Sequence, residues 1–403
     1  MERPKVAVVR CRDYQAESLS AAIGRALELI GSLSRVLSPA ARVFVKVNHL
    51  SSFAPPERAI NTHPEFVRQA VRLLLDHGAR VTVGDDIAAT GDDGFQATGY
   101  RRVCAELGVP LVNLKETGFV ELLIRGAVLD RVYIARPVLE ADFLVNLPKL
   151  KTHSFTIFTG AVKNMYGVIP LGLRLHFHRR FIRNDVFSRM LVDLYAAVPP
   201  RLTVMDAVVG MEGEGPSAGR PRAIGLILAG FDGVAVDAVA TQVAGYHPGA
   251  VFTTVHAGER GIGVADLRRI DVVGEPIQDV AVKDFRASAA AVRLFRSKIP
   301  SLLYAFFQSE LVLIPEVIPE ICTGCQECIR ICPCGAVRLV GTAARVDEQK
   351  CIHCLCCHEA CPHEAIRLKQ LPLGRLIRLG SGAYGKFKAL LRRADGPSGN
   401  PVS

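Results

Sequence analysis

The chain has 403 residues, 49% of them hydrophobic and 22% charged, and its formal net charge is +10 at pH 7. This composition excludes an intrinsically disordered chain, and the length favours two or three domains. No run reaches the roughly 18 apolar residues that a membrane-spanning helix needs, and the amino terminus lacks the pattern of a signal peptide. We therefore expect a cytoplasmic protein without a transmembrane segment.

From its start to about residue 275, the chain alternates short apolar runs with longer stretches of helical periodicity. Runs rich in Val, Ile and Leu are typical of strands buried on both faces of a mostly parallel sheet. We therefore predict an α/β domain of sheet and helix layers over residues 1–275. Strands are expected at Lys5–Cys11, Arg42–Val47, Arg80–Gly84, Pro110–Leu114, Phe143–Leu147, Leu202–Met205, Ile224–Leu228 and Ile270–Val273. Helices are expected at Glu17–Leu33, Pro64–His77, Gly94–Leu107, Asn184–Ala197 and Gly233–Ala244.

Polar side chains cluster after two of these strands, where ligands bind in open parallel sheets. Lysines, a histidine and an asparagine follow the strand at Phe143–Leu147, with glycines that allow close backbone approach, and this combination suits an anionic ligand. We predict that Lys151 and His153 take part in catalysis, His153 as a proton donor or metal ligand. The predicted substrate-binding residues are Lys46, Asn48, Lys149, Lys163 and Asn164.

A glycine-rich segment, expected to be a loop, follows the strand at Leu202–Met205 and ends near Gly219. It lacks the GxGxxG order of a phosphate-binding loop, and its acidic side chains Glu212 and Glu214 would repel phosphate. Asp206 and Glu212 fit better as acid/base groups, metal ligands or partners of the lysines, and we predict both as catalytic residues.

Four segments in this order resemble the family called domain of unknown function 362. They are KLKTH at 149–153, AVKNMYG at 161–167, VVGMEGEGPSAG at 208–219 and FDGVAVD at 231–237. The resemblance spans roughly residues 40–275 and implies a large domain that is often fused to a two-cluster ferredoxin module. It names no substrate.

Residues 276–319 break the rhythm of the large domain, with four prolines around the apolar stretch Leu302–Ile314. We predict that this segment is a connector that packs against one or both domains, because an exposed run so apolar would be a liability.

Ten of the twelve cysteines lie between Cys322 and Cys361, a clustering that indicates metal binding. Two runs fit CxxCxxCxxxCP, in which three thiolates bind one cubane and the cysteine before proline crosses to the other. Zinc is the alternative for isolated CxxC pairs, but two complete runs favour two 4Fe-4S clusters. The predicted ligands are Cys322, Cys325, Cys328 and Cys361 for one cluster and Cys351, Cys354, Cys357 and Cys332 for the other.

The stretch from Glu320 to Lys369 resembles bacterial-type two-cluster ferredoxin modules. The resemblance implies a small α+β domain at residues 320–370, with two short helices and two hairpins related by a pseudo-twofold axis. Cys334 and Cys356 lie outside the ligand positions, and we interpret them as small apolar side chains that fill space.

Residues 371–403 form a basic tail in which six Lys and Arg residues face one acidic residue. Either a short amphipathic helix at Lys386–Arg393 or an irregular segment is expected there. The tail suits peripheral contact with an anionic membrane surface or an acidic protein. The segment Gly380–Phe387 is no P-loop, because Phe387 stands where a Ser or Thr is required.

The leading hypothesis is an iron-sulfur reductase that relays electrons between a ferredoxin- or flavodoxin-type partner and an anionic small molecule in the large domain. Two alternatives stay open: an iron-sulfur carrier or assembly factor, and a ferredoxin-like shuttle without catalysis of its own. Nucleic-acid binding is disfavoured, because the chain has no Trp and its basic excess is concentrated in the tail.

Overall fold

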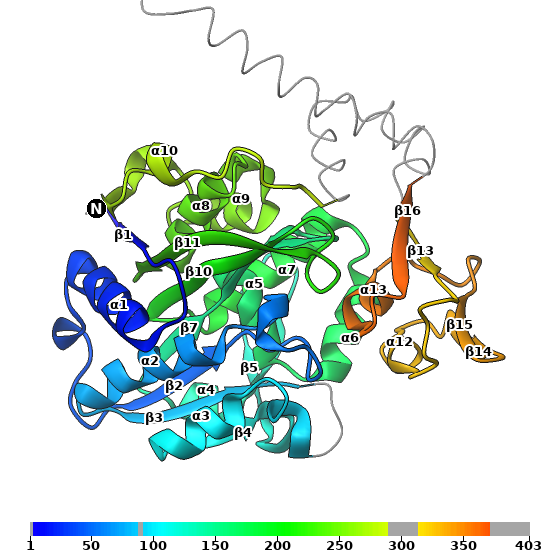
Figure 1. The fold of residues 1–403 in the computed structure, drawn as a ribbon, viewed down its shortest axis with the longest axis horizontal. Coiled ribbons are helices and arrows are strands. Elements are labelled where there is room, and N and C mark those ends of the chain that lie inside the picture. The colour runs from blue at the N-terminus through cyan, green and yellow to red at the C-terminus, as the bar shows by residue number, and fades with distance from the viewer. Residues whose placement is uncertain (1–2, 88–91, 289–312, 371–403) are drawn as a thin grey trace, which may run out of the picture.

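The computed structural model describes residues 3–87, 92–288 and 313–370 (Figure 1). An α/β unit extends to residue 288, and a small C-terminal unit begins at strand β13 (Leu313–Val317). The predicted basic tail, with its expected helix and the P-loop-like segment, lies outside the described residues, as does most of the apolar stretch of the connector.

Within the described residues, ten strands of the α/β unit form one sheet. Strands β4, β3, β2, β7 and β10 lie side by side and run parallel. Strand β11 is antiparallel to β10 and β1, and β12 pairs in parallel with β1 at the edge. The predicted, mostly parallel sheet is thus confirmed. The strands are β1 (Lys5–Arg10), β2 (Arg42–Val47), β3 (Arg80–Asp85), β4 (Leu111–Asn113), β7 (Phe143–Leu147), β8 (Lys149–His153), β9 (Ile157–Thr159), β10 (Leu202–Glu212), β11 (Arg220–Gly230) and β12 (Asp271–Gly274), with a separate hairpin of β5 (Phe119–Leu123) and β6 (Arg131–Ala135).

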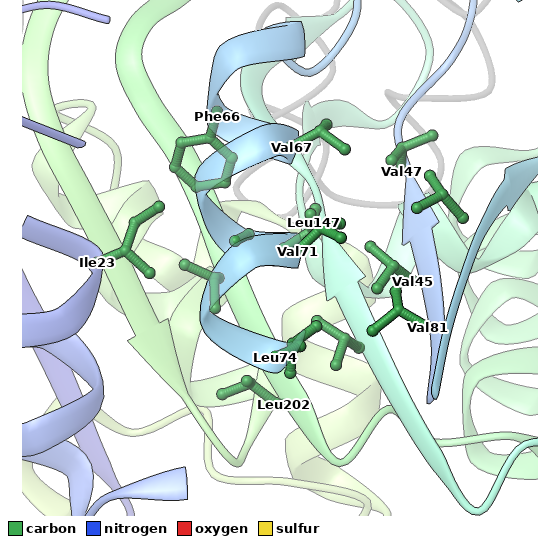
Figure 2. Close-up of a cluster of buried hydrophobic side chains, with 14 of the residues drawn as sticks. Ile23, Val45, Val47, Phe66, Val67, Val71, Leu74, Val81, Leu147 and Leu202 are labelled. Atoms are coloured by element: carbon green, nitrogen blue, oxygen red, sulfur yellow. The ribbon is translucent and has the colours of Figure 1, made fainter. Parts of the chain in front are cut away.

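Helices cover both faces of this sheet. One face packs against α1, α2 and α3, and the other against helices that include α7 and α8. Figure 2 shows Phe66, Val67, Val71 and Leu74 of α2 on the sheet, and their spacing is that of one helix face. The helices are α1 (Ala16–Ile30), α2 (Pro64–Asp76), α3 (Tyr100–Leu107), α4 (Arg136–Glu140), α5 (Ala161–Asn164), α6 (Leu171–Arg180), α7 (Asn184–Ala197), α8 (Gly233–Val243), α9 (Phe252–Glu259) and α10 (Ile277–Val280).

The α/β unit differs from the sequence-based expectation in one segment that bears on function. The KLKTH segment, expected to follow a strand as a loop, is itself strand β8, and all five of its residues are buried. Pro148 separates β7 from β8, and both pair in parallel with β10. Lysine and histidine are uncommon inside buried strands, which is why the sequence pattern indicated a loop.

Two other boundaries also move. Strand β10 continues to Glu212, so the glycine-rich segment is the end of a strand followed by the turn between β10 and β11. The helix expected at Gly94–Leu107 begins only at Tyr100, because the residues before it form a short 3₁₀ turn and Gly99 adopts a left-handed backbone conformation.

The C-terminal unit contains two antiparallel strand pairs and two short helices, as the ferredoxin resemblance implies. Its first strand, β13, pairs with its last, so the unit includes residues that precede the expected start at 320. Its further elements are α12 (Glu327–Arg330), β14 (Val337–Val340), β15 (Ala343–Val346), α13 (Cys356–Ala360) and β16 (Ile366–Gln370). No helix in the three described ranges is long and apolar enough to cross a membrane.

Candidate functional site

The first part of the site lies where the parallel strands β2 and β3 end. Lys46 Nζ and Asp85 Oδ1 are 2.7 Å apart, and both side chains are almost fully buried. Lys46 also donates to the carbonyl oxygen of Val47 at 2.7 Å, and Asp85 accepts a hydrogen bond from the backbone N–H of His49 at 2.8 Å. Burial lowers the pKa of Lys46, and the charge of Asp85 opposes that change. Lys46 is therefore held in place by a carboxylate partner.

Strand β8 contributes Lys151 and His153, which lie two residues apart and so share one face of the strand. Lys151 Nζ donates to the carbonyl oxygen of Ile60 at 2.7 Å. Burial, and after it the charge of Lys163, lowers the pKa of Lys151 well below its ordinary value. An anion beside Lys151 would offset this cost of burial.

The hydrogen bonds of His153 determine which of its ring nitrogens carries the proton. Its Nδ1 accepts from the backbone N–H groups of Phe155, at 3.0 Å, and Thr156, at 3.3 Å. The proton therefore belongs on Nε2, and burial keeps the ring neutral by lowering its pKa well below the ordinary value. In this geometry His153 is a hydrogen-bond donor, and neither of its nitrogens offers a free lone pair to a metal.

Helix α5 places Lys163 and Asn164 beside the ends of these strands. The carboxylate of Asp237 accepts from the first two backbone N–H groups of α5, at 2.6 and 3.0 Å, and so anchors the helix. Asn164 donates to the side-chain oxygen of Asn146 at 2.7 Å. Lys163 Nζ lies 5.6 Å from the centre of the Tyr166 ring. Asp237, which was expected to be a helix-terminus or site carboxylate, thus acts on the terminus of a neighbouring helix.

The C-terminal unit supplies the opposite wall of the site. A cavity of about 150 Å³ is lined by residues from both units, among them Cys356, Glu359 and Ala360 of α13. Figure 1 shows α13 beside α6, whose Arg174 and His178 also line the cavity. Six of the nine predicted catalytic and substrate-binding residues line it together: Lys46, Asn48, Lys151, His153, Lys163 and Asn164.

Direct contacts hold the two units together beside this cavity. Arg58 of the α/β unit forms an ion pair with Glu364 and donates to the carbonyl oxygen of Ser217 at 3.0 Å. Ser217 in turn donates to the carbonyl oxygen of His358, at 3.2 Å. Arg58 and Ser217 thus link the α/β unit to both sides of the second cysteine run.

Three predicted site residues lie elsewhere. Lys149 and Asp206 form a fully buried ion pair, 2.8 Å apart, and both are hydrogen-bonded to the hydroxyl of Tyr14. Glu212 accepts a hydrogen bond from the backbone N–H of Arg286 at 3.0 Å. None of the three lines the cavity.

Sequence analysis missed several residues of the cavity wall. Asp85 and Asp86 directly follow a predicted strand, so the reasoning that selected Lys46 would have found them. Asp86 pairs with Arg174 at 2.9 Å, and burial raises the pKa of Asp86. Glu359 has no such signal, because it lies about 200 residues away in the sequence and reaches the site only through the arrangement of the two units.

The cysteines of the C-terminal unit gather in two sets. One small cavity is lined by Cys322, Cys325, Cys328 and Cys361, the ligands predicted for one cluster. Near Cys357, the thiols of Cys354, Cys351 and Cys332 add to burial in raising its pKa, so those four also lie close together. Among the described residues, no three His, Cys, Asp or Glu side chains converge closely enough to hold one metal ion, and the sulfurs instead surround a space.

Backbone N–H groups point at several of these sulfurs. Ala336 donates to Cys332 at 3.2 Å and Ala365 donates to Cys361 at 3.3 Å, the same four-residue relation in both runs. Such N–H···S contacts stabilise thiolates and tune the potential of a bound cluster. The surroundings of the sulfurs therefore fit iron-sulfur clusters, whose positive irons offset the unfavourable burial of thiolates.

The comparisons with known proteins agree with this division into two units. A family model described as a domain of unknown function (DUF362) matches residues 43–242, and a 4Fe-4S dicluster domain matches residues 314–362. Over 257 residues, the chain is 30% identical to the thylakoid-associated protein sll1697 of Synechocystis sp., an overlap of 63% of this chain and 78% of that protein. The chain belongs to the DUF362 family. This DUF362 protein also carries a 4Fe-4S domain, the type of module that transfers single electrons.

Two further likenesses are more limited. Over 48 residues, the DUF362 protein is 42% identical to one component of an ion-translocating oxidoreductase complex from Methanosarcina acetivorans, which is 12% of this chain and 18% of that protein. The lactate racemase apoprotein from Thermoanaerobacterium thermosaccharolyticum is a structural neighbour with a TM-score of 0.39 and 17% identity. That match covers 57% of this chain and 54% of the neighbour, so the DUF362 protein spans about half of the neighbour's length.

Proposed function

We propose that this DUF362 protein is an iron-sulfur reductase that passes electrons, through two 4Fe-4S clusters, to a small anion in the cavity between its units. The observation that supports this most directly is the composition of the cavity wall. Cys356, the neighbour of the predicted cluster ligand Cys357, lines the same cavity as Lys151, Lys163 and His153. A ligand held by the lysines would therefore lie next to a source of electrons.

The proposed ligands of the two clusters are the two cysteine sets, and the bound clusters would each supply or accept one electron at a time. Cys325 is exposed, whereas Cys354 and Cys357 are buried on the side of the cavity. Electrons would enter near Cys325 from a partner protein of the ferredoxin or flavodoxin type and leave near Cys357. The unequal exposure of the two sets supports this direction.

The residues of the α/β unit would bind and orient the ligand. Lys151 and Lys163 would attract an anion, and the Nε2–H of His153 would donate a hydrogen bond to one of its oxygens. The cavity has about the volume of an engineered cavity that binds benzene, so the ligand has roughly six non-hydrogen atoms. Protons for the reduced product would come from water, because a neutral imidazole is a poor acid.

A lysine variant tests the role of the cavity. Lys163→Met should keep the iron content of the wild type and slow reoxidation of the reduced protein by a small anionic oxidant about tenfold or more, since a lost charged hydrogen bond costs about 1.5–3 kcal/mol. The measurement is anaerobic stopped-flow absorbance of the clusters, and Lys5→Met, at an exposed site on β1, is the control.

Equal rates for the two variants with every oxidant that reoxidises the wild type would exclude the cavity as the site of reduction. Reoxidation of the wild type by carrier proteins and by no small anion is the result expected of an electron shuttle.

A second pair of variants tests the number of clusters. The wild type should bind about eight iron atoms, four for each cubane. Cys357→Ala should lose the cluster that Cys357 ligates, whereas Cys356→Ala, at the adjacent buried cysteine, should keep the full iron content. Iron and sulfide analysis of anaerobically purified protein distinguishes these results, and an equal loss in both variants would contradict the ligand assignment.

A further inference from the structure

Glu359 reaches the cavity from the cluster-binding unit. Its side chain is 13% exposed, and its Oε1 lies 3.4 Å from Nε2 of His153, the ring nitrogen that carries the proton. Neither of these two buried atoms has a hydrogen bond of good geometry within the described residues. A carboxylate oxygen and a ring N–H thus face each other at the edge of a cavity without being satisfied by the protein.

The other charged groups of the cavity divide into those with an ion-pair partner and those without. Lys46 is paired with Asp85, and Arg174 is paired with Asp86. Across the described residues, neither Lys151 nor Lys163 has a carboxylate within ion-pair distance. These two lysines therefore face the space that a ligand would fill.

Glu359 is the carboxylate that acts on both of these lysines. Its charge raises the pKa of Lys151 and of Lys163, against the larger effect of burial, which lowers them. The cavity therefore sets two lysines and a neutral imidazole N–H against one carboxylate. With both lysines protonated, one negative charge on the ligand completes the balance, and a second one meets the repulsion of Glu359.

We infer that Glu359 selects the charge of the ligand, so that the cavity takes a small monoanion, such as a monocarboxylate, and disfavours an isosteric dianion. This inference rests on the proposed anion site and adds the class of its ligand. The cluster-binding unit then does more than carry electrons, because it supplies the residue that decides which anion binds. Charges about 5 Å apart in a partly buried site interact by enough to change affinity tenfold or more.

Oxamate and oxalate are a matched pair of probes, because they have the same planar shape and differ by one charge. Binding of each to the full chain with its clusters is measured by anaerobic calorimetry at pH 8. The wild type should bind oxamate more tightly than oxalate. In Glu359→Gln, the ratio of oxalate affinity to oxamate affinity should rise about tenfold or more, since Gln keeps the size of the side chain and removes its charge.

Two further variants control this experiment. Glu364→Gln removes a carboxylate of the same unit that pairs with Arg58 outside the cavity, and it should keep the wild-type ratio. Glu359→Asp keeps the charge, and it should keep the preference for oxamate even where the shorter side chain weakens binding. Iron content and cluster absorbance establish that each variant is intact.

The possible failures are distinguishable. Oxalate binding to the wild type as tightly as oxamate overturns the inference without any variant, and so does an unchanged ratio in Glu359→Gln. Either result leaves the anion site of the proposed function in place. Binding of neither probe to the wild type or to Glu359→Gln overturns the anion site itself, and the inference with it.

Discussion

Lys149, Lys151 and His153 show what can be deduced from residue types and where the deduction ends. Alternate residues of a strand share a face, so the three side chains of β8 were rightly grouped. They are also spread along the strand by about 3.3 Å per residue, which separates Lys149 from His153 by about 13 Å. Lys149 lies opposite Asp206 in the register of β8 and β10, and that register is invisible in the sequence.

A buried histidine gives the first prediction, which concerns pH. Burial lowers the pKa of His178 to about 3, against about 6.5 in an unfolded chain. The unfolded state therefore binds more protons below pH 6.5, and the folded state loses stability as the pH falls from 6.5 towards 3. Between pH 7.5 and 5.5, His178 should cost about 1.4 kcal/mol of stability.

His178→Leu should remove this contribution, so the drop in the midpoint of thermal unfolding between pH 7.5 and 5.5 should become smaller than in the wild type. His176 on the same helix is exposed, and His176→Leu should leave the drop unchanged. Scans of all three proteins at one heating rate provide the measurement. An identical drop in His178→Leu and the wild type would contradict the prediction.

At the scale of elements, hydrophobic pattern predicted most of the α/β unit. The strands Arg42–Val47 and Phe143–Leu147 and the helix Asn184–Ala197 have the expected bounds, because their apolar side chains follow the period of the element. Strand β8 was missed because its polar residues serve the site and contradict the strand pattern. Local sequence rules failed where function places charged groups inside the fold.

Gly167 provides a prediction at this scale, because it follows α5 and touches the end of β3. A Cβ at Gly167 would lie 2.4 Å from Asp85 Oδ1 and 2.9 Å from Lys46 Nζ. Gly167→Ala should therefore displace this ion pair, lower stability by about 1–3 kcal/mol and weaken anion binding. Thermal unfolding and calorimetry with oxamate test both effects.

Gly172 is the matched control for this substitution. It lies in the first turn of α6, and a Cβ there would meet nothing within 4 Å. Gly172→Ala should keep anion binding and raise stability slightly, since Ala favours helix over Gly by about 1 kcal/mol. Equal effects of the two substitutions would show that the close approach at Gly167 is unimportant.

At the scale of the whole molecule, the sequence predicted two units but not the site between them. Each unit has its own residue pattern, and the spacing of cysteines is a local signal that needs no tertiary information. The cavity has no comparable signal, because its walls come from residues that lie far apart in the chain and meet only when the units dock. Lys151 and Lys163 could be found from sequence, and their carboxylate neighbour Glu359 could not.

Arg58 tests how firmly the units are docked. Arg58→Ala removes the ion pair with Glu364 and the hydrogen bond to Ser217. Partly exposed pairs of this kind contribute up to about 1 kcal/mol, so opening of the interface should become up to about fivefold more frequent. Faster hydrogen exchange of the backbone amides of α13, read by mass spectrometry, is the expected result.

Arg131→Ala is the control, because Arg131 pairs with Glu121 within the β5–β6 hairpin, away from the interface. That variant should exchange at the wild-type rate in α13. Identical exchange in both variants would mean that the contacts of Arg58 do not limit the docking of the C-terminal unit.

The pairing of β13 with β16 has a consequence for how such proteins can diversify. Leu313 lies opposite Gln370, so the chain enters and leaves the C-terminal unit at neighbouring points. A unit with this connection can be exchanged like a cassette, without rethreading the sheet of the α/β unit. A replacement that kept the cysteines but lacked a carboxylate at the position of Glu359 would still conduct electrons, and it would deliver them to a different anion.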